Sequence, residues 1–163
     1  MATTEVIMKK IAFFPGTFDP VTVGHLDIIQ RALELFDEVV IGIGVNTAKQ
    51  PLFSEEQRHK WLVDLFQNQP RIRVTIYDGL TVDCCRKEGA RFILRGVRNG
   101  TDLEYEKAIA DVNRIAAKNI ETIFLTCRPE YSTISSTLVR DMIRHKRDIS
   151  EYLPEVVIKD LSL

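Results

Sequence analysis

The stretch GTFDPVTVGH, residues 16–25, decides how this sequence folds. It follows directly on the apolar run IAFF, residues 11–14, which is typical of a buried strand. Gly16 lacks the side chain that would keep a phosphate away from the backbone. Thr22 is a suitable N-cap, so His25 falls in a first helical turn, where free N–H groups attract anions. The stretch therefore predicts a strand, an anion-binding turn and a helix.

Apolar and helical patterns alternate outward from this stretch over the whole chain. Apolar runs predict strands at residues 10–15, 38–45, 71–77, 91–95 and 121–126. Apolar residues at helical spacing predict helices at residues 25–36, 54–66, 80–89, 101–119 and 135–146. The tail, residues 148–161, predicts a short helix, a break at Pro154 and a last helix. Five βα units in series favour one α/β domain, whose five-stranded parallel sheet carries helices on both faces.

Individual residues predict where helices begin and end. Ser54 with Gln57, and Thr101 with Glu104, have the spacing of capping boxes. Gly89 is expected to end the short helix before it. In a sheet of this kind, ligands bind at the carboxyl ends of the strands, where the strand order reverses.

Length and charge limit the class of protein. A chain of 163 residues forms one domain, here residues 1–163, with residues 1–8 as a flexible lead-in. The formal net charge of −1 gives no electrostatic reason to expect a nucleic-acid or membrane partner. The chain has no apolar run of about 18 residues, and its first residues lack the apolar core of a signal peptide. An anionic ligand must therefore be held by a local cluster of cations.

The cysteines indicate a reducing compartment. Cys84, Cys85 and Cys127 make an odd count without a CxxC pair, and adjacent cysteines are poorly placed to bond to each other. We therefore expect free thiols and a cytoplasmic protein.

The turn after the first strand differs from the common phosphate-binding motifs. Neither GxGxxG nor GxxxxGK[ST] occurs in the sequence. A histidine at a helix start can donate a hydrogen bond to phosphate oxygens. Taken alone, His25 would equally suit a structural turn with a surface histidine.

Two motifs together give this turn a family resemblance. TVGH, residues 22–25, resembles the TxGH signature of nucleotidyltransferases that share a Rossmann-like fold with class I aminoacyl-tRNA synthetases. ISSTLVR, residues 134–140, resembles the second signature of that superfamily. The resemblance implies a single Rossmann-like domain.

Longer segments narrow the resemblance. Residues 46–58, 93–106 and 131–140 are similar to the phosphopantetheine adenylyltransferase family, and the similarity runs from about Lys10 to Pro154. That family reversibly transfers the adenylyl group of ATP to 4′-phosphopantetheine, giving dephospho-coenzyme A and pyrophosphate in coenzyme A biosynthesis. The attacking phosphate monoester is mostly a dianion at neutral pH. The chemistry therefore needs positioning and charge neutralisation, and no Ser–His–Asp set is evident.

The resemblance implies roles for individual residues. His25 would be the catalytic residue that stabilises the pentacoordinate α-phosphorus. The 4′-phosphopantetheine side would be formed by Thr17, Lys49, Thr81 and Arg95. The ATP side would be formed by Thr17, Phe18, His25, Gly96, Val97, Arg98, Glu106, Tyr131, Ser132, Thr133, Ile134, Ser135, Ser136 and Thr137. Without the resemblance, Lys49 would be a solvated lysine, Glu106 a helix-dipole partner, and the hydroxyls near Ser135 simple caps.

The resemblance also implies an ion and an assembly. Mg²⁺ is expected to arrive with ATP, and no protein metal site is expected, since this ion keeps its waters. A homohexamer is implied by the family and by nothing in the residues themselves. The chain departs from the family at Cys84 and Cys85, where a Phe-Ala type of pair is usual, and at Phe14, where some members carry Tyr. Both departures fall on the expected pantetheine pocket.

Three other functions stay open at this point. An adenylyltransferase that uses nicotinamide mononucleotide would share both signatures but should lack RGVRNGTDLEYE, residues 95–106. A cytidylyltransferase would have a second signature closer to RTxGIST. A non-catalytic nucleotide-binding module would not need His25, Lys49, Arg95 and Arg98 together.

Overall fold

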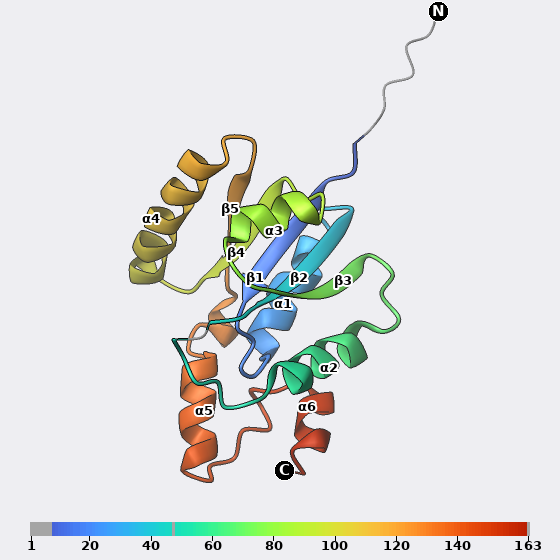
Figure 1. The fold of residues 1–163 in the computed structure, drawn as a ribbon. Coiled ribbons are helices and arrows are strands. Elements are labelled where there is room, and N and C mark those ends of the chain that lie inside the picture. Colours follow the sequence, from blue (N-terminus) through green and yellow to red (C-terminus); the bar gives the residue numbers. More distant parts are fainter. Residues whose placement is uncertain (1–7, 47, 163) are drawn as a thin grey trace, which may run out of the picture.

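Five parallel strands form one sheet at the centre of the protein (Figure 1). The computed structural model describes residues 8–46 and 48–162, so the expected lead-in lies outside the described residues except for Met8. The strands are β1 (Ile11–Gly16), β2 (Glu38–Gly44), β3 (Ile72–Tyr77), β4 (Phe92–Val97) and β5 (Glu121–Thr126). Their order is β3-β2-β1-β4-β5, and every neighbouring pair is parallel. The predicted α/β fold is confirmed.

Helices cover both faces of this sheet (Figure 1). They are α1 (Val23–Ala32), α2 (Glu55–Phe66), α3 (Thr81–Lys87), α4 (Gly100–Ala116), α5 (Ser136–Arg144) and α6 (Glu155–Asp160), with a short 3₁₀ helix at Pro129–Tyr131. Alternate strand residues divide the core, because successive side chains point to opposite faces. Phe14 packs in a cluster with residues of α1, α2, α5 and α6, whereas Phe13 packs in a second cluster with residues of α3.

The second core cluster accounts for two of the thiols. Cys84 and Cys85 are buried on α3 beside Phe13, and all three cysteines of the chain are free, as predicted. Burial raises the pKa of the Cys85 thiol to about 12 and also raises the pKa of Cys84. Both side chains therefore act as small apolar groups rather than as reactive thiolates.

Several helix ends differ from the predictions. Thr22 and Ser54 cap α1 and α2 as expected, but α4 is capped by Asn99, whose side chain accepts from the Asp102 N–H at 2.9 Å. The prediction of a Thr101–Glu104 capping box was wrong. Asn99, two residues earlier, has an extended backbone and is at least as good a capping residue. Helix α1 ends at Ala32, four residues before the predicted end.

The tail also differs from its prediction. Residues 148–153 form turns instead of the expected short helix, and α6 begins directly after Pro154. In the described parts of the chain, no helix is long and apolar enough to cross a membrane.

The strand order reverses between β1 and β4, and the two strands separate there. The β1–β2 register covers six residue pairs, from Ile11 to Gly16, whereas the β1–β4 register covers only Ala12 with Phe92 and Phe13 with Ile93. Beyond these pairs the carboxyl ends of β1 and β4 diverge. Sheets of this order bind ligands at such a point, which is where the sequence places its motifs.

Candidate active site

A cleft of about 440 Å³ lies at the diverging ends of β1 and β4. It brings together most of the residues expected to contact ATP, from three distant segments of the chain. Those that line it are Thr17, Phe18, His25, Gly96, Arg98, Glu106, Tyr131, Ile134, Ser135, Ser136 and Thr137. Lys49 and Arg95, which are expected on the 4′-phosphopantetheine side, line the same cleft. Val97, Ser132 and Thr133 belong to the same segments but do not line this cleft.

A second cavity of about 320 Å³ adjoins the first. Thr81 lines this second cavity with Tyr77 and Asn46, and its hydroxyl lies 3.1 Å from the Tyr77 hydroxyl. Desolvation by burial raises the pKa of Tyr77, so the phenol stays protonated and can donate. Thr81 therefore lies outside the cleft that most of the expected ATP contacts line, where a second, longer substrate could extend.

The two cavities share one wall. Pro15, Gly16, Thr17, Arg95 and Glu106 line both of them. A group bound at this wall is within reach of a ligand in either cavity.

An ion pair forms the centre of the shared wall. Arg95 donates from Nε and Nη2 to the two carboxylate oxygens of Glu106 at 2.7 and 2.6 Å, and from Nη1 to the Pro15 carbonyl at 2.5 Å. Glu106 is the one buried residue of α4. Arg95 thus bridges the gap between β4 and β1 while its charge is balanced by α4.

A second ion pair joins the turn directly after β4 to α4. Arg98 donates from Nε to Asp102 at 2.8 Å, and this hydrogen bond lowers the pKa of the Asp102 carboxyl. Asp102 and Glu106 are four residues apart on α4, so they face the cleft from successive turns. The sequence did not lead us to select Asp102, although its position four residues after Arg98 is typical of a helical ion pair.

The turn after β1 is shaped by an aromatic ring. A Cβ atom at Gly16 would lie 2.9 Å from the ring of Phe18, so this position requires glycine because the ring folds back over it. Phe18 has φ of 49°, in the left-handed region that bulky residues rarely adopt. Its ring packs edge-on against His25 at a centroid distance of 5.0 Å.

His25 is both the N3 residue of a capping box and part of the cleft wall. The Thr22 N–H donates to His25 Nδ1 at 3.0 Å, and the His25 N–H donates to Thr22 Oγ1 at 3.4 Å. Because Nδ1 accepts, the ring proton of the neutral imidazole is on Nε2. Burial, with Arg95 and Arg98 adding to it, lowers the pKa of His25 to about 4. His25 is therefore a neutral hydrogen-bond donor at physiological pH.

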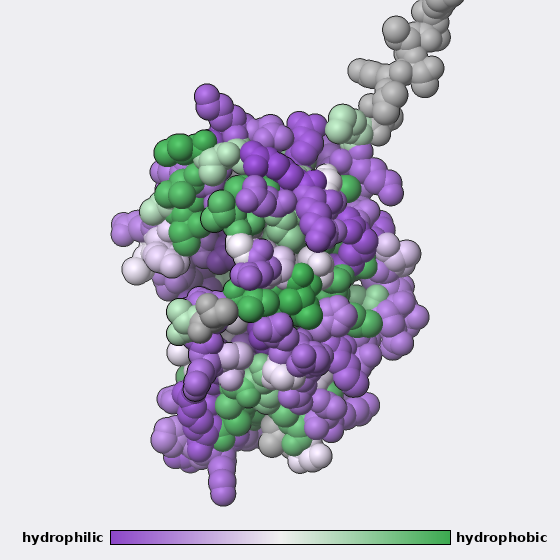
Figure 2. Space-filling model, viewed as in Figure 1, coloured by the Kyte–Doolittle hydropathy of each residue, from purple (hydrophilic) through white to green (hydrophobic). Residues whose placement is uncertain are grey.

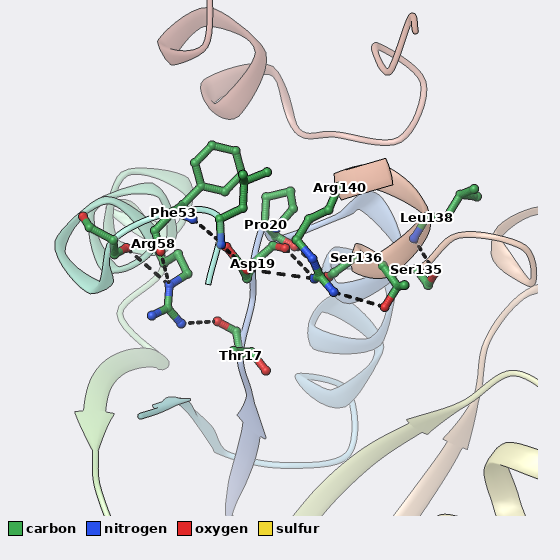
Figure 3. Close-up of polar contacts among 12 residues, drawn as sticks. Thr17, Asp19, Pro20, Phe53, Arg58, Ser135, Ser136, Leu138 and Arg140 are labelled. Carbon is green, nitrogen blue, oxygen red and sulfur yellow. Dashed lines mark hydrogen bonds and ion pairs between the residues drawn. The ribbon is translucent and has the colours of Figure 1, made fainter. Parts of the chain in front are cut away.

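The second signature forms the far side of the cleft. The Ser135 side chain caps α5 by accepting from the Leu138 N–H at 3.1 Å, and Ser136 Oγ donates to the Pro20 carbonyl at 2.9 Å (Figure 3). The free N–H groups of this helix start face an open cleft that anions can enter. The capping role and the expected ligand-binding role of these hydroxyls are compatible.

Arg140 and Tyr105 line the cleft although the sequence analysis gave them no role. Arg140 donates to the Asp19 carbonyl at 2.8 Å and to Thr137 Oγ1 at 3.2 Å. It is the arginine of the motif ISSTLVR, so the motif itself contained the signal.

The fold and the cleft define a class of protein. A family model described as cytidylyltransferase-like matches residues 13–142, which span β1 through most of α5. A solved structure from Vibrio parahaemolyticus, described as a candidate nicotinate-nucleotide adenylyltransferase, shares the fold with a TM-score of 0.66. It is 24% identical and covers 96% of this chain and 100% of its own, so it supports the fold alone.

Relatives with closer sequences define the family within that class. The protein named phosphopantetheine adenylyltransferase in Flavobacterium psychrophilum is 53% identical over 150 residues, covering 92% of this chain and 98% of the relative. The protein of the same name in Bacteroides thetaiotaomicron is 47% identical over 148 residues, covering 91% and 97%. The chain therefore belongs to the phosphopantetheine adenylyltransferase family of cytidylyltransferase-like proteins.

Proposed function

We propose that this chain is an enzyme that reversibly transfers the adenylyl group of ATP to 4′-phosphopantetheine, giving dephospho-coenzyme A and pyrophosphate. The observation that carries the proposal is the pair of adjoining cavities in a member of this family. The larger cavity suits ATP and the smaller one suits the pantetheine arm. The phosphates of the two substrates would then meet at the wall formed by Thr17 and Arg95.

The acceptor phosphate supplies the attacking charge. A phosphate monoester has its second pKa near about 6, so its dianion can attack the α-phosphorus without a protein base. A bond forms between an oxygen of the acceptor phosphate and the α-phosphorus of ATP. The bond between the α-phosphorus and the oxygen that bridges it to the β-phosphorus breaks, and pyrophosphate leaves with that oxygen. The residues of the chain orient the two phosphates and offset the charge that gathers between them.

His25 would act on this developing charge. Its Nδ1 is held by Thr22, so Nε2–H remains to donate to an α-phosphate oxygen. A donor already held in place stabilises the transition state without reorganisation. Because the imidazole is neutral, it supports the charge by hydrogen bonding and not as a cation.

The remaining contacts divide between the substrates. Lys49 and Arg95 would bind the acceptor phosphate, and Thr81 the pantetheine arm. Gly96, Val97, Arg98 and Glu106, with residues 131–137, would bind ATP. Arg140 adds a further cation on the ATP side of the cleft.

ATP would enter as its Mg²⁺ complex, with the ion as part of the substrate. Among residues 8–46 and 48–162, no three His, Cys, Asp or Glu side chains gather as metal ligands. The support for this proposal is the preference of Mg²⁺ for water and phosphate oxygens. A cytoplasmic location is supported by the free thiols of Cys84, Cys85 and Cys127.

A homohexamer is proposed from the family and supported by one surface. Helix α4 buries only Glu106 and exposes several large apolar side chains, namely Leu103, Tyr105, Ile109, Val112 and Ile115. Figure 2 shows hydrophobic residues gathered at the upper left of the molecule, where Figure 1 places α4. Tyr105, Ile109 and Val112 share one side of the helix, and an exposed apolar face is typical of a subunit interface.

A pyrophosphate-release assay tests the function. With Mg²⁺ and ATP, we expect turnover with 4′-phosphopantetheine and background rates with nicotinamide mononucleotide. Replacing ATP by CTP should abolish turnover. Higher kcat/KM for nicotinamide mononucleotide, or for CTP, would overturn the assignment. The named relatives do not favour either alternative.

A further inference from the structure

Two buried charged residues lie beside the cleft without lining it. Asp19 is 3% exposed and Arg58 is 2% exposed, and the reaction proposed above uses neither of them. Buried charges destabilise a fold unless hydrogen bonds satisfy them, so their partners indicate what they are for.

Arg58 binds only backbone carbonyls among its described partners. Its Nη1 donates to the Thr17 carbonyl at 2.7 Å, and its Nε donates to the carbonyls of Phe53 and Ser54 at 3.1 and 3.3 Å. Arg58 lies in the second turn of α2. One guanidinium thus joins the start of α2 to the turn after β1.

Asp19 makes the reciprocal contacts. Its two carboxylate oxygens accept from the N–H groups of Leu52 and Phe53 at 2.8 and 2.9 Å. The Asp19 carboxylate of the turn therefore accepts hydrogen bonds from the loop, and the Arg58 guanidinium on α2 donates to the turn (Figure 3). We call Asp19 and Arg58 with these backbone partners the brace.

The brace encloses the strained residue of the turn. Phe18, with φ of 49°, lies between Thr17, whose carbonyl Arg58 holds, and Asp19, whose carboxylate holds the loop. A bulky residue persists in this conformation only where its surroundings enforce it. The Asp19 carbonyl is held in addition by Arg140, from the second signature.

The loop at the other end of the brace carries Lys49, three residues before Leu52. We propose that Asp19 and Arg58 are positioning residues, which hold Thr17 and the Lys49 loop as one unit around the acceptor phosphate. This inference rests on the proposed function. Apolar side chains would stabilise the fold at lower cost, whereas two charges whose side-chain hydrogen bonds go to backbone groups set the relative position of two loops. The Asp19 carboxylate has one further partner, Arg140 Nη1 at 4.0 Å.

Asp19→Asn tests the proposal with an isosteric change. The amide presents an NH₂ group to a backbone N–H, so one of the two hydrogen bonds to the loop is lost. We expect KM for 4′-phosphopantetheine to rise about tenfold, equivalent to about 1.4 kcal/mol, and KM for ATP to change less than about twofold. Amide hydrogen exchange in residues 48–53 should also become faster.

Asp160→Asn is the matched control. Asp160 accepts from Trp61 Nε1 at 2.8 Å and from Gln57 Nε2 at 3.2 Å, and it does not line either cavity. Asp160→Asn should weaken these hydrogen bonds and lower the melting temperature, and it should leave both KM values unchanged. If Asp19→Asn behaves in the same way, Asp19 is merely structural and the proposal is overturned.

Arg58→Lys serves as a second variant should Asp19→Asn fail to fold. Lysine keeps the charge but cannot hold three carbonyls with a planar fork, so the acceptor KM should again rise and exchange in the loop should accelerate. Unchanged exchange overturns the proposal. A wild-type protein without turnover on 4′-phosphopantetheine would contradict the proposed function instead, and the exchange measurement would still decide whether the brace holds the loop.

Discussion

His25 combines a structural contact and a chemical one in a single side chain. Nδ1 accepts from the backbone of Thr22, which satisfies a helix end, and this leaves the proton on Nε2. The rings of Phe14 and Phe18 lie beside the imidazole, at centroid distances of 6.3 and 5.0 Å, and cover part of it. A helix cap has thereby become a donor whose tautomer is set by the fold.

His25→Ala should lower kcat about a hundredfold to a thousandfold, as the loss of one held donor to a transition state does. KM for ATP should change little, because the donor acts on charge that develops in the reaction. Steady-state kinetics measure both, and a circular dichroism melt checks the fold. His145→Ala, at the exposed end of α5, is the control. A higher KM at constant kcat would contradict the assigned role.

The acid limb of the rate profile should belong to the substrate. The pKa of His25 is lowered to about 4, so the imidazole stays neutral while the phosphate, with its second pKa near about 6, becomes protonated. Activity should fall as the pH drops through about 6. A phosphonate analogue with a different second pKa should move this limb, and a limb that stays in place would assign it to the enzyme.

The lowered pKa of His25 also makes the stability of the fold depend on pH. In the unfolded chain His25 has its ordinary pKa of 6.5, whereas in the folded chain its pKa is about 4. The unfolded state therefore binds more protons in this interval, and the free energy of unfolding falls as the pH drops from about 6.5 to 4.

Helix α4 and strand β4 act together as one structural unit. Arg95 and Arg98 at the end of β4 pair with Glu106 and Asp102 on α4. The start of α4 therefore determines where both carboxylates lie. The turn between the two elements is short, and Asn99 ends it.

Asn99→Ala should cost about 1 kcal/mol in the free energy of unfolding, because the cap of α4 is lost. Thr101→Ala, at the residue that the sequence pattern favoured as the cap, should cost less than about 0.5 kcal/mol, the usual limit for exposed positions. Urea unfolding measures both. Equal losses would contradict the Asn99 assignment.

Lys49→Ala should separate the two substrates. Hydrogen bonds to charged groups are worth about 1.5–3 kcal/mol, so the Kd for 4′-phosphopantetheine should rise at least about tenfold while that for ATP stays within about twofold. Titration calorimetry with each ligand measures this. Lys60→Ala, which removes an exposed lysine paired with Asp64, is the control. Equal losses of affinity for both ligands would contradict the assignment of Lys49 to the 4′-phosphopantetheine side.

Patterns of several residues predicted more than single positions did. The strands and most helices follow from apolar periodicity, which depends on local sequence and burial. The prediction that Thr101 caps α4 was wrong, because two good capping residues lie two positions apart and only the tertiary position of the helix selects Asn99. The pairing of Arg95 with Glu106 could not be predicted, since it depends on how α4 lies against β4 in the folded chain.

The assembly of the protein should depend on the exposed side of α4. Val112→Glu and Ile115→Glu place charges at residues that are 65% and 80% exposed, so the subunit itself should still fold. If this face is the interface, light scattering should show a smaller species for these variants than for the wild-type protein. Val63→Glu, at an exposed apolar residue of α2, is the control. Variants that keep the wild-type mass would place the interface elsewhere.

The Arg95–Glu106 ion pair should also affect which anions compete for the site. Cells contain free phosphate and many small phosphate esters, and an arginine without a partner would attract all of them. Glu106 balances the charge of Arg95 and occupies two of its N–H groups, so a small anion meets little net positive charge there and must bind beside a carboxylate. A small ion has only this one contact to offset the cost, whereas a molecule that extends along both cavities gathers many others. We therefore expect the site to favour anions that extend along both cavities over small anions of the same charge.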